Sequence, residues 1–235
     1  MISAFSFTCD RDQDLSDLMC KTLQKHCKKL QRIEVTNTKG TNYFNGAGWE
    51  ASMLKIEGLR KLLRHNIDDN DWILSIDSDV VFTNTKVFDW IDQVTSFRYN
   101  HFDIIGIQQV TDRAKTEMGL LNNMSGCSIY LRGSLAKKIA ALTSEQLDSV
   151  HELFKAWVLT ENEDIVISYL AQMLGAHALP IPDHMYNGDL NLDLTEGKET
   201  RCFYHLNYAP SFFLGVPVAG KHEIPKALRE KGIEL

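Results

Sequence analysis

Short apolar runs that alternate with amphipathic helical patterns limit the fold of this 235-residue chain more than any other feature. Strands are predicted at residues 2–8 (ISAFSFT), 31–36, 72–76 (WILSI), 102–109, 127–132, 177–181 and 202–208. Helical patterns lie between them, at residues 15–27, 49–65, 86–97, 133–142, 144–158 and 162–174. Such alternation is typical of helices that connect neighbouring strands. We therefore predict an α/β fold with a mostly parallel central sheet flanked by helices.

The composition is that of a globular protein with a core, since 44% of the residues are apolar and 24% are charged. No linker, repeat or low-complexity run divides the chain, so we expect a single domain over residues 1–235. The net charge of −6 argues against a protein whose main task is to bind nucleic acid, because phosphate binding needs a basic surface.

The expected location is the cytoplasm, or the cytoplasm of the host cell for a viral protein. No run of about 18 apolar residues is present, and the first residues, MISAFSFTCDRDQD, lack the basic and apolar regions of a secretory signal. Five cysteines are scattered without a CxxC pair, which favours reduced thiols buried as small apolar side chains.

Two aspartates, Asp77 and Asp79, follow directly on WILSI and give the strongest chemical signal in the chain. In an open parallel sheet, ligands bind beyond the carboxyl ends of the strands. Two carboxylates placed there offer the hard oxygen ligands that Mg²⁺ and Mn²⁺ prefer. The alternative is a polar corner between strand and loop, where aspartates are common. The long apolar run before the pair favours a functional site.

Several segments, in this order, resemble the glycosyltransferases of the GT-A fold. They are FTCDRD, the helix ASMLKIEGLRKLLR, SIDSDVVF with its Asp-X-Asp, NNMSGCSIYLR, ENEDIVISYLAQMLG and a late CFYH. The resemblance extends over most of the chain and implies a single GT-A-like, Rossmann-like domain. It further implies a nucleotide-binding half at about residues 1–110 and an acceptor and lid half at about residues 111–235.

The resemblance also implies a divalent cation, Mn²⁺ or Mg²⁺, that bridges the diphosphate of a nucleotide-sugar. Asp79 would be a direct ligand, Asp77 would contact the metal or the ribose, and Ser78 would belong to the nucleotide site. Such a cation acts as a Lewis acid on the leaving nucleoside diphosphate. A late histidine is often the third ligand; His205 in CFYH is the candidate, and His222 is the alternative. The competing interpretation of His205 is a strand histidine satisfied in the core.

An acidic pair, Glu163 and Asp164, opens a helical pattern. By resemblance to inverting GT-A enzymes, Asp164 is the expected general base that takes the proton from the acceptor hydroxyl, and Glu163 is the second candidate. Retaining members also place acids nearby, so the stereochemical course stays open. Capping is the alternative role, because the helix dipole favours carboxylates at a helix N-terminus.

The segment after the first strand is expected to bind the nucleoside through Thr8, Asp10 and Arg11. A carboxylate can accept hydrogen bonds from ribose hydroxyls, and a guanidinium can pair with phosphate. The alternative is a surface turn in which Asp12 or Asp14 starts a helix.

Two more segments belong to the expected donor and acceptor sites. Lys221 and His222, with Lys226, are expected to close over the diphosphate as a basic lid, and the alternative is a solvated tail. Ser125 and Gly126 are expected to line the sugar pocket, where a small residue allows the backbone to approach a ligand.

The sequence thus predicts a hexosyl- or pentosyltransferase, with UDP as the carrier that the resemblance implies. The acceptor stays open between a glycan, a protein, a small metabolite and, as a minority option, a hydroxylated DNA base. A DNA acceptor would require base flipping and a basic groove. The candidates for such a groove are the clusters at residues 25–32 and 60–64.

Two other functions compete with glycosyl transfer. A phosphatase of the haloacid-dehalogenase type is one, because IDSDVV fits its D-x-D-x-V motif and Gly188, Asp189 and Asp193 supply a GDxxxD. That family places its D-x-D on the first strand, whereas 76 residues precede Asp77 here. The other is a domain that binds a nucleotide-sugar without turnover, against which the number of acidic candidates argues.

Overall fold

The computed structural model describes residues 1–38, 48–96, 101–109, 122–156, 163–187, 203–205, 212–213, 216–217, 221–230, 232 and 234–235. The chain forms two compact units, each built from three segments. The first comprises Met1–Cys9, Gln31–Asp77 and His101–Pro180, and the second comprises Asp10–Leu30, Ser78–Asn100 and Ile181–Leu235. The expected single domain, with halves at about residues 1–110 and 111–235, stays a prediction.

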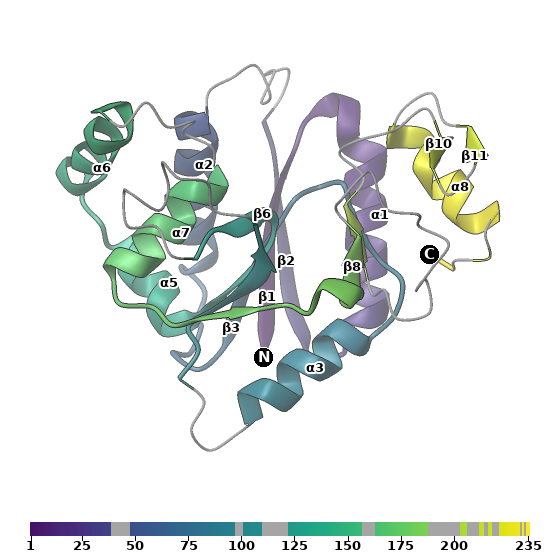
Figure 1. Ribbon diagram of the computed structural model, residues 1–235, viewed down its shortest axis with the longest axis horizontal. Coiled ribbons are helices and arrows are strands. Elements are labelled where there is room, and N and C mark those ends of the chain that lie inside the picture. Colours follow the sequence, from purple (N-terminus) through teal and green to yellow (C-terminus); the bar gives the residue numbers. More distant parts are fainter. Residues whose placement is uncertain are drawn as a thin grey trace. The chain divides into compact units, whose positions relative to one another are not determined.

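A six-stranded mixed sheet in the order β2-β1-β3-β6-β5-β7 lies in the first unit (Figure 1). The strands are β1 (Ile2–Thr8), β2 (Leu30–Asn37), β3 (Trp72–Ile76), β5 (Ile104–Gln108), β6 (Met124–Arg132) and β7 (Ala178–Pro180). β1 is parallel to β3 and β5 to β7, whereas β6 runs antiparallel to both β3 and β5. β1, β3, β5 and β7 therefore share one direction, and β6 runs the opposite way. This arrangement confirms the predicted mostly parallel α/β sheet.

Burial follows the position of each strand in the sheet. Every residue of β1 and β3 is buried, as is typical of central strands covered on both faces. β2 forms one edge and exposes residues along its length. β7 forms the other edge; it is short and ends at Pro180, a residue that edge strands tolerate because it cannot donate to a ladder.

Among the described residues, four helices belong to the first unit: α2 (Gly48–Leu62), α5 (Gly133–Ala140), α6 (Ser144–Ala156) and α7 (Glu163–Met173). α2 contacts β1 and α7, and α5 contacts β3 and β6. Their apolar stripes meet strand side chains in one core that includes Phe5, Ile56, Leu59, Ile73, Ile129, Leu135, Ile165 and Leu170. The sequence predicted these four helices, with ends that differ by a few residues.

The second unit has a smaller sheet, in the order β4-β9-β8, of β4 (Val80–Phe82), β9 (Phe203–His205) and β8 (Tyr186–Asn187). α1 (Gln13–His26) packs on β4, where the buried Phe82 N–H donates to Thr22 Oγ1 at 3.2 Å. The other elements are α3 (Lys86–Ser96), α8 (Ile224–Glu230), the β10–β11 pair (Phe212–Phe213, Val216–Pro217) and the 3₁₀ turns η1 (Asp10–Asp12), η2 (Asp183–Met185) and η3 (Lys221–Glu223). The sequence did not predict β4 or α8.

The described cysteines match the sequence prediction. Cys9, Cys27 and Cys127 are buried, Cys20 is half-buried, and none of these four forms a disulfide. Cys202 lies outside the described residues. Among the helices that the structure describes, none has both the length and the hydropathy needed to cross a bilayer.

Candidate functional site

A buried lysine holds the acidic segment at the carboxyl end of β3. Asp77 is the first residue after β3, and its backbone N–H donates to Cys127 O at 3.0 Å. Its Oδ1 accepts from Lys55 Nζ at 3.1 Å, and the same ammonium group donates to Gly126 O at 2.8 Å. The Lys55 side chain is 3% exposed and that of Asp77 is 25% exposed. Because a buried ammonium is costly unless it is paired, these contacts fix both side chains.

Sequence reasoning did not single out Lys55. The residue lies in α2 on the stripe that also holds Ser52, Ile56 and Leu59, all of which are buried. A lysine on the buried face of an amphipathic helix needs a counter-charge there, and the two aspartates that follow the next strand were candidates for it. That signal was present in the segment ASMLKIEGLRKLLR.

Asp79 is almost fully buried, at 3% exposure, and it directly precedes β4 in the second unit. Ser78 beside it is half-buried. β4 pairs antiparallel with β9, and Val80 is the register partner of His205. The small sheet therefore brings the backbone of the predicted histidine next to the residue that follows Asp79.

The residue types at this place fit a divalent cation. A buried carboxylate and an imidazole are ligands that Mn²⁺ accepts, and a second carboxylate, Asp77, lies two residues before Asp79 in the chain. Among the side chains that the structure describes, no three His, Cys, Asp or Glu groups gather as a metal cluster. The His205 side chain lies outside that described set, so its role as a ligand stays a prediction.

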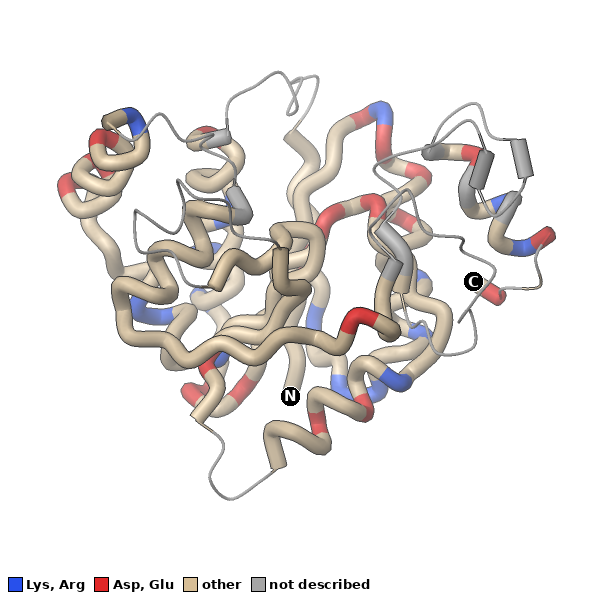
Figure 2. The backbone as a smooth tube through the Cα atoms, viewed as in Figure 1, with Lys and Arg blue, Asp and Glu red and all other residues tan. Residues whose placement is uncertain are grey.

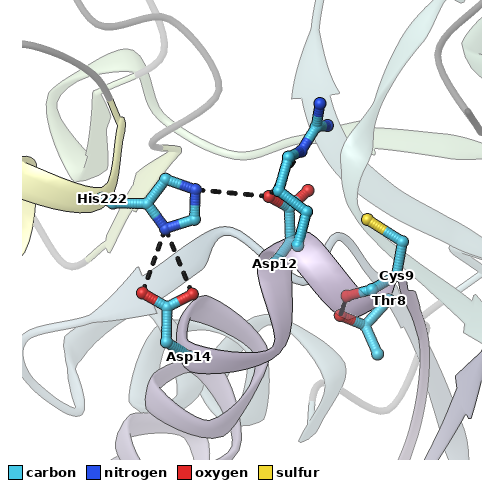
Figure 3. Close-up of polar contacts among 6 residues, drawn as sticks. Thr8, Cys9, Asp12, Asp14 and His222 are labelled. Carbon is cyan, nitrogen blue, oxygen red and sulfur yellow. Dashed lines mark hydrogen bonds and ion pairs between the residues drawn. The ribbon is translucent and has the colours of Figure 1, made fainter. Parts of the chain in front are cut away.

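The start of α1 gathers charged groups from distant parts of the second unit. His222, in η3, lies between two carboxylates (Figure 3): Nδ1 is 3.0 Å from Asp14 Oδ2, and Nε2 is 3.5 Å from Asp12 Oδ1. Arg11 Nε donates to Asp12 Oδ1 at 3.3 Å. Asp12 is the residue before α1, but its side chain makes no capping hydrogen bond. Its carboxylate, which is buried, serves the contacts to Arg11 and His222 instead.

The other nucleotide candidates lie around this point of the chain. Asp10 and Arg11 are exposed in η1. Thr8 ends β1 and is buried; its hydroxyl donates to Cys9 O at 3.3 Å, and its carbonyl accepts from Thr38 N at 2.9 Å. Lys221 begins η3, and its side chain is outside the described set.

The predicted acidic pair does open a helix, because α7 begins at Glu163. The side chains of Glu163 and Asp164 are outside the described set, so the base assignment stays a prediction. Ser125 and Gly126 lie in β6, and the carbonyl of Gly126 accepts from Lys55. This contact ties the segment expected at the sugar pocket to the lysine that orients Asp77.

Three basic residues of the two clusters are held by contacts within the protein. Lys29 pairs with Asp92 at 2.8 Å and Lys25 with Glu234 at 3.2 Å. Arg60 donates to two backbone carbonyls, those of Ala140 and Leu142, at 2.9 and 2.7 Å. Acidic and basic positions are interspersed on α3, α6 and α8 (Figure 2). Lys25, Lys29 and Arg60 are thus engaged in contacts within the protein.

The structure resembles solved glycosyltransferases over nearly its whole length. A glycosyltransferase involved in the glycosylation of the major capsid of PBCV-1 aligns with a TM-score of 0.57 and 11% identity, over 97% of this chain and 98% of that chain. The galactosyltransferase LgtC, in complex with donor and acceptor sugar analogs, aligns with a TM-score of 0.58 and 11% identity, over 98% and 96%. No protein-family model and no curated protein sequence matches the chain. The chain has the GT-A-like fold that these glycosyltransferases share.

Proposed function

We propose that this protein is a metal-dependent glycosyltransferase that moves a sugar from a nucleotide-sugar to an acceptor hydroxyl. The observation that carries the proposal is the buried Lys55–Asp77 pair, which orders the Asp-X-Asp segment at the carboxyl end of β3. The packing of a hydrophobic core does not require the ammonium group of Lys55 beside Asp77, or a second buried carboxylate at Asp79. Buried charges of this kind concentrate at functional sites. The shared fold with glycosyltransferases gives this site its context.

In this proposal, Asp79 and His205 hold Mn²⁺ or Mg²⁺, and Asp77 contacts the metal or the ribose. The cation, when bound, supplies a Lewis acid for the negative charge that grows on the leaving diphosphate. Lys55 keeps Asp77 in one orientation, so the carboxylate loses little further freedom on binding.

The nucleotide is bound by groups on either side of the start of α1. Thr8, Asp10 and Arg11 bind the nucleoside and its phosphates, and Ser78 belongs to the same site. Lys221 and His222 contribute positive or hydrogen-bonding groups from η3. The described contacts of His222 with Asp12 and Asp14 hold η3 at the first turn of α1, which supports a role near Arg11.

Asp164 is the proposed general base, with Glu163 as the second candidate. The base removes the proton of the acceptor hydroxyl while the hydroxyl oxygen attacks the anomeric carbon; the bond between that carbon and the diphosphate breaks, and the diphosphate leaves with the electron pair.

We propose UDP as the carrier. For the acceptor we favour a glycan or a protein over a DNA base, because one structural neighbour is described as involved in the glycosylation of a capsid and because Lys25 and Lys29 are paired with carboxylates.

The test is calorimetric titration of the protein with UDP in the presence and absence of Mn²⁺. We expect binding that depends on Mn²⁺ and is lost in Asp79→Asn and in His205→Gln, two variants that remove proposed ligands from distant parts of the chain. Asp148→Asn, an exposed aspartate on α6, is the matched control and should bind as the parent does. Binding that is unchanged in both ligand variants would refute the metal site. If no nucleoside diphosphate binds with either metal, the proposal fails, and phosphatase activity becomes the function to assay.

A further inference from the structure

A pocket lies in the first unit at the amino ends of β1 and β2. It has a volume of about 400 Å³, which is within the range of small-molecule sites. Its polar lining comes from three places: the start of β1, the start of β2 and the segment after α2. The side chains concerned are Ser3, Gln31, Arg32, Arg64, His65 and Asn66. None of them was assigned to the donor or the metal, and Arg32 and Arg64 belong to the two basic clusters that were considered for a DNA acceptor.

The pocket carries an excess of positive charge. Each of the two basic clusters in the sequence contributes one arginine, Arg32 from the first and Arg64 from the second. The Arg32 guanidinium contacts the His65 ring, with Nη1 2.7 Å from Nδ1. One carboxylate stands nearby, since Glu34 Oε2 lies 3.7 Å from His65 Nε2. Two guanidinium groups against one carboxylate leave room for an anionic ligand.

The donors are those that phosphate oxygens accept. A guanidinium presents N–H groups in a planar fork that matches phosphate, and these charge-assisted hydrogen bonds are stronger than neutral ones. The amides of Gln31 and Asn66 add neutral donors at the pocket wall, and the buried Ser3 hydroxyl donates to Gln31 Oε1 at 3.4 Å. The lining thus combines two charged donors with neutral ones around a space of about 400 Å³.

The helix dipole explains only part of this arrangement. Cations near a helix C-terminus are favoured by the dipole, and Arg64 and His65 follow the last residue of α2, Leu62. Arg32 is not part of that helix. It extends from β2, and its described contact is to the His65 ring and not to a helix carbonyl. A second guanidinium brought to the same pocket from another element is therefore left unexplained by the dipole.

The pocket is also separate from the proposed donor site. Ser3 lies at the beginning of β1, whereas Thr8 lies at its end. Five strand residues span about 16 Å. A diphosphate that contacts Thr8 could not also lie against Ser3.

From these observations we infer that the pocket lined by Arg32 and Arg64 binds a phosphate group, either as inorganic phosphate or as a phosphomonoester of a small molecule. The inference goes beyond the proposed glycosyl transfer and does not depend on it. Inorganic phosphate and a phosphomonoester present the same kind of oxygen to the arginines. Only the phosphomonoester also carries a substituent that the pocket could bind.

The test is an NMR titration of the ¹⁵N-labelled full chain, without metal or nucleotide, with inorganic phosphate and, separately, with glucose 6-phosphate. We expect saturable shifts of the backbone amides of residues 31–32 and 64–67. Arg32→Gln and Arg64→Gln should each weaken binding by about tenfold or more, as the loss of a charged hydrogen bond implies. Lys61→Gln is the matched control, because Lys61 lies on the last turn of α2 but pairs with Glu57 outside the pocket.

Tighter binding of glucose 6-phosphate would assign the site to a phosphomonoester, and tighter binding of inorganic phosphate would assign it to the free anion. Either result supports the inference. It is overturned if neither probe gives saturable shifts at millimolar concentration, if acetate binds as well as phosphate, or if both arginine variants bind like Lys61→Gln.

Discussion

At the scale of single residues, Lys55 is the side chain on which the order of the acidic segment most depends. Its ammonium group donates to Asp77 and to the Gly126 carbonyl. Lys55→Met keeps an unbranched side chain, one atom shorter, but removes both hydrogen bonds and the positive charge beside Asp77. Because Asp77 is 25% exposed, the cost is below that of a fully buried pair. We expect the free energy of unfolding to fall by about 2 kcal/mol, measured by urea denaturation.

Lys61→Met on the same helix is the control for this experiment. Lys61 and Glu57 form an (i, i+4) pair at 3.1 Å with both side chains partly exposed. Exposed pairs contribute little, so we expect a change within about 0.5 kcal/mol. Equal losses in the two variants would show that the buried contacts of Lys55 do not stabilise the fold.

Cys27, at the end of α1, gives a prediction for alkaline pH. Burial raises the pKa of its thiol from 9.0 to about 11. The folded protein therefore keeps the thiol proton over a range in which the unfolded chain has lost it. This contribution to stability is fully present below pH 9 and is lost as the pH rises toward 11.

Urea denaturation across that pH range tests the effect. We expect the free energy of unfolding of Cys27→Ala to fall less steeply with pH than that of the parent. The difference between the two proteins should be constant at lower pH, where the thiol is protonated in both states. Parallel curves up to pH 11 would mean that the Cys27 thiol does not contribute to the pH dependence.

At the scale of elements, backbone hydrogen bonds join the start of α5 to the loop before β3. Gly133 N–H donates to Asp71 O at 2.8 Å, and Ser134 N–H donates to Asp69 O at 3.1 Å. A Cβ atom at Gly133 would lie 2.1 Å from Asp68 O, a backbone atom that cannot rotate away. Gly133→Ala must therefore displace the helix or the loop.

We expect Gly133→Ala to lower the free energy of unfolding by about 3 kcal/mol, at the upper end of the usual cost of overpacking. Ser134→Ala is the control, because alanine keeps the N–H that donates to Asp69 O. Hydrogen exchange should be faster in α5 of the glycine variant and unchanged in the control. Similar stability of the two variants would show that the loop can move at little cost.

The elements also show what the sequence could predict and what it could not. Continuous apolar runs predicted β1 and β3, because strands buried throughout leave an unbroken apolar signal. The antiparallel direction of β6 left no such signal, since its apolar run suits either direction. β4 was missed because its three residues pair with β9, more than 100 residues further along the chain, and local patterns do not report such pairing.

At the scale of the whole molecule, the sequence predicted the α/β fold and most of its helices, and it selected Asp77 and Asp79 from the place where a strand ends. It could not predict partners that tertiary folding brings together. Lys55 reaches Asp77 from 22 residues away, and His222 reaches Asp14 from 208 residues away. Arg32 and Arg64 belong to separate basic clusters in the sequence, and only the fold places both on one pocket.

The two proposed sites lead to a prediction for the stability of the whole chain. A ligand that binds only the folded state stabilises it by about 2.7 kcal/mol at a hundred times its Kd. For a chain of this length, each kcal/mol raises the Tm by about 2–4 °C. We expect UDP with Mn²⁺ and phosphate each to raise the Tm, and their effects on the free energy of unfolding to add, because sites without shared residues act independently.

Thermal unfolding of two variants separates the contributions. Asp79→Asn should lose the increment from UDP with Mn²⁺ and keep that from phosphate, whereas Arg64→Gln should show the reverse. The reason is spatial: the residues assigned to the nucleotide follow the carboxyl ends of β1 and β3, and the arginine pocket lies at the amino ends of β1 and β2. If one substitution abolished both increments, the two ligands would share a site, and the phosphate shifts would have to be reassigned to the donor site.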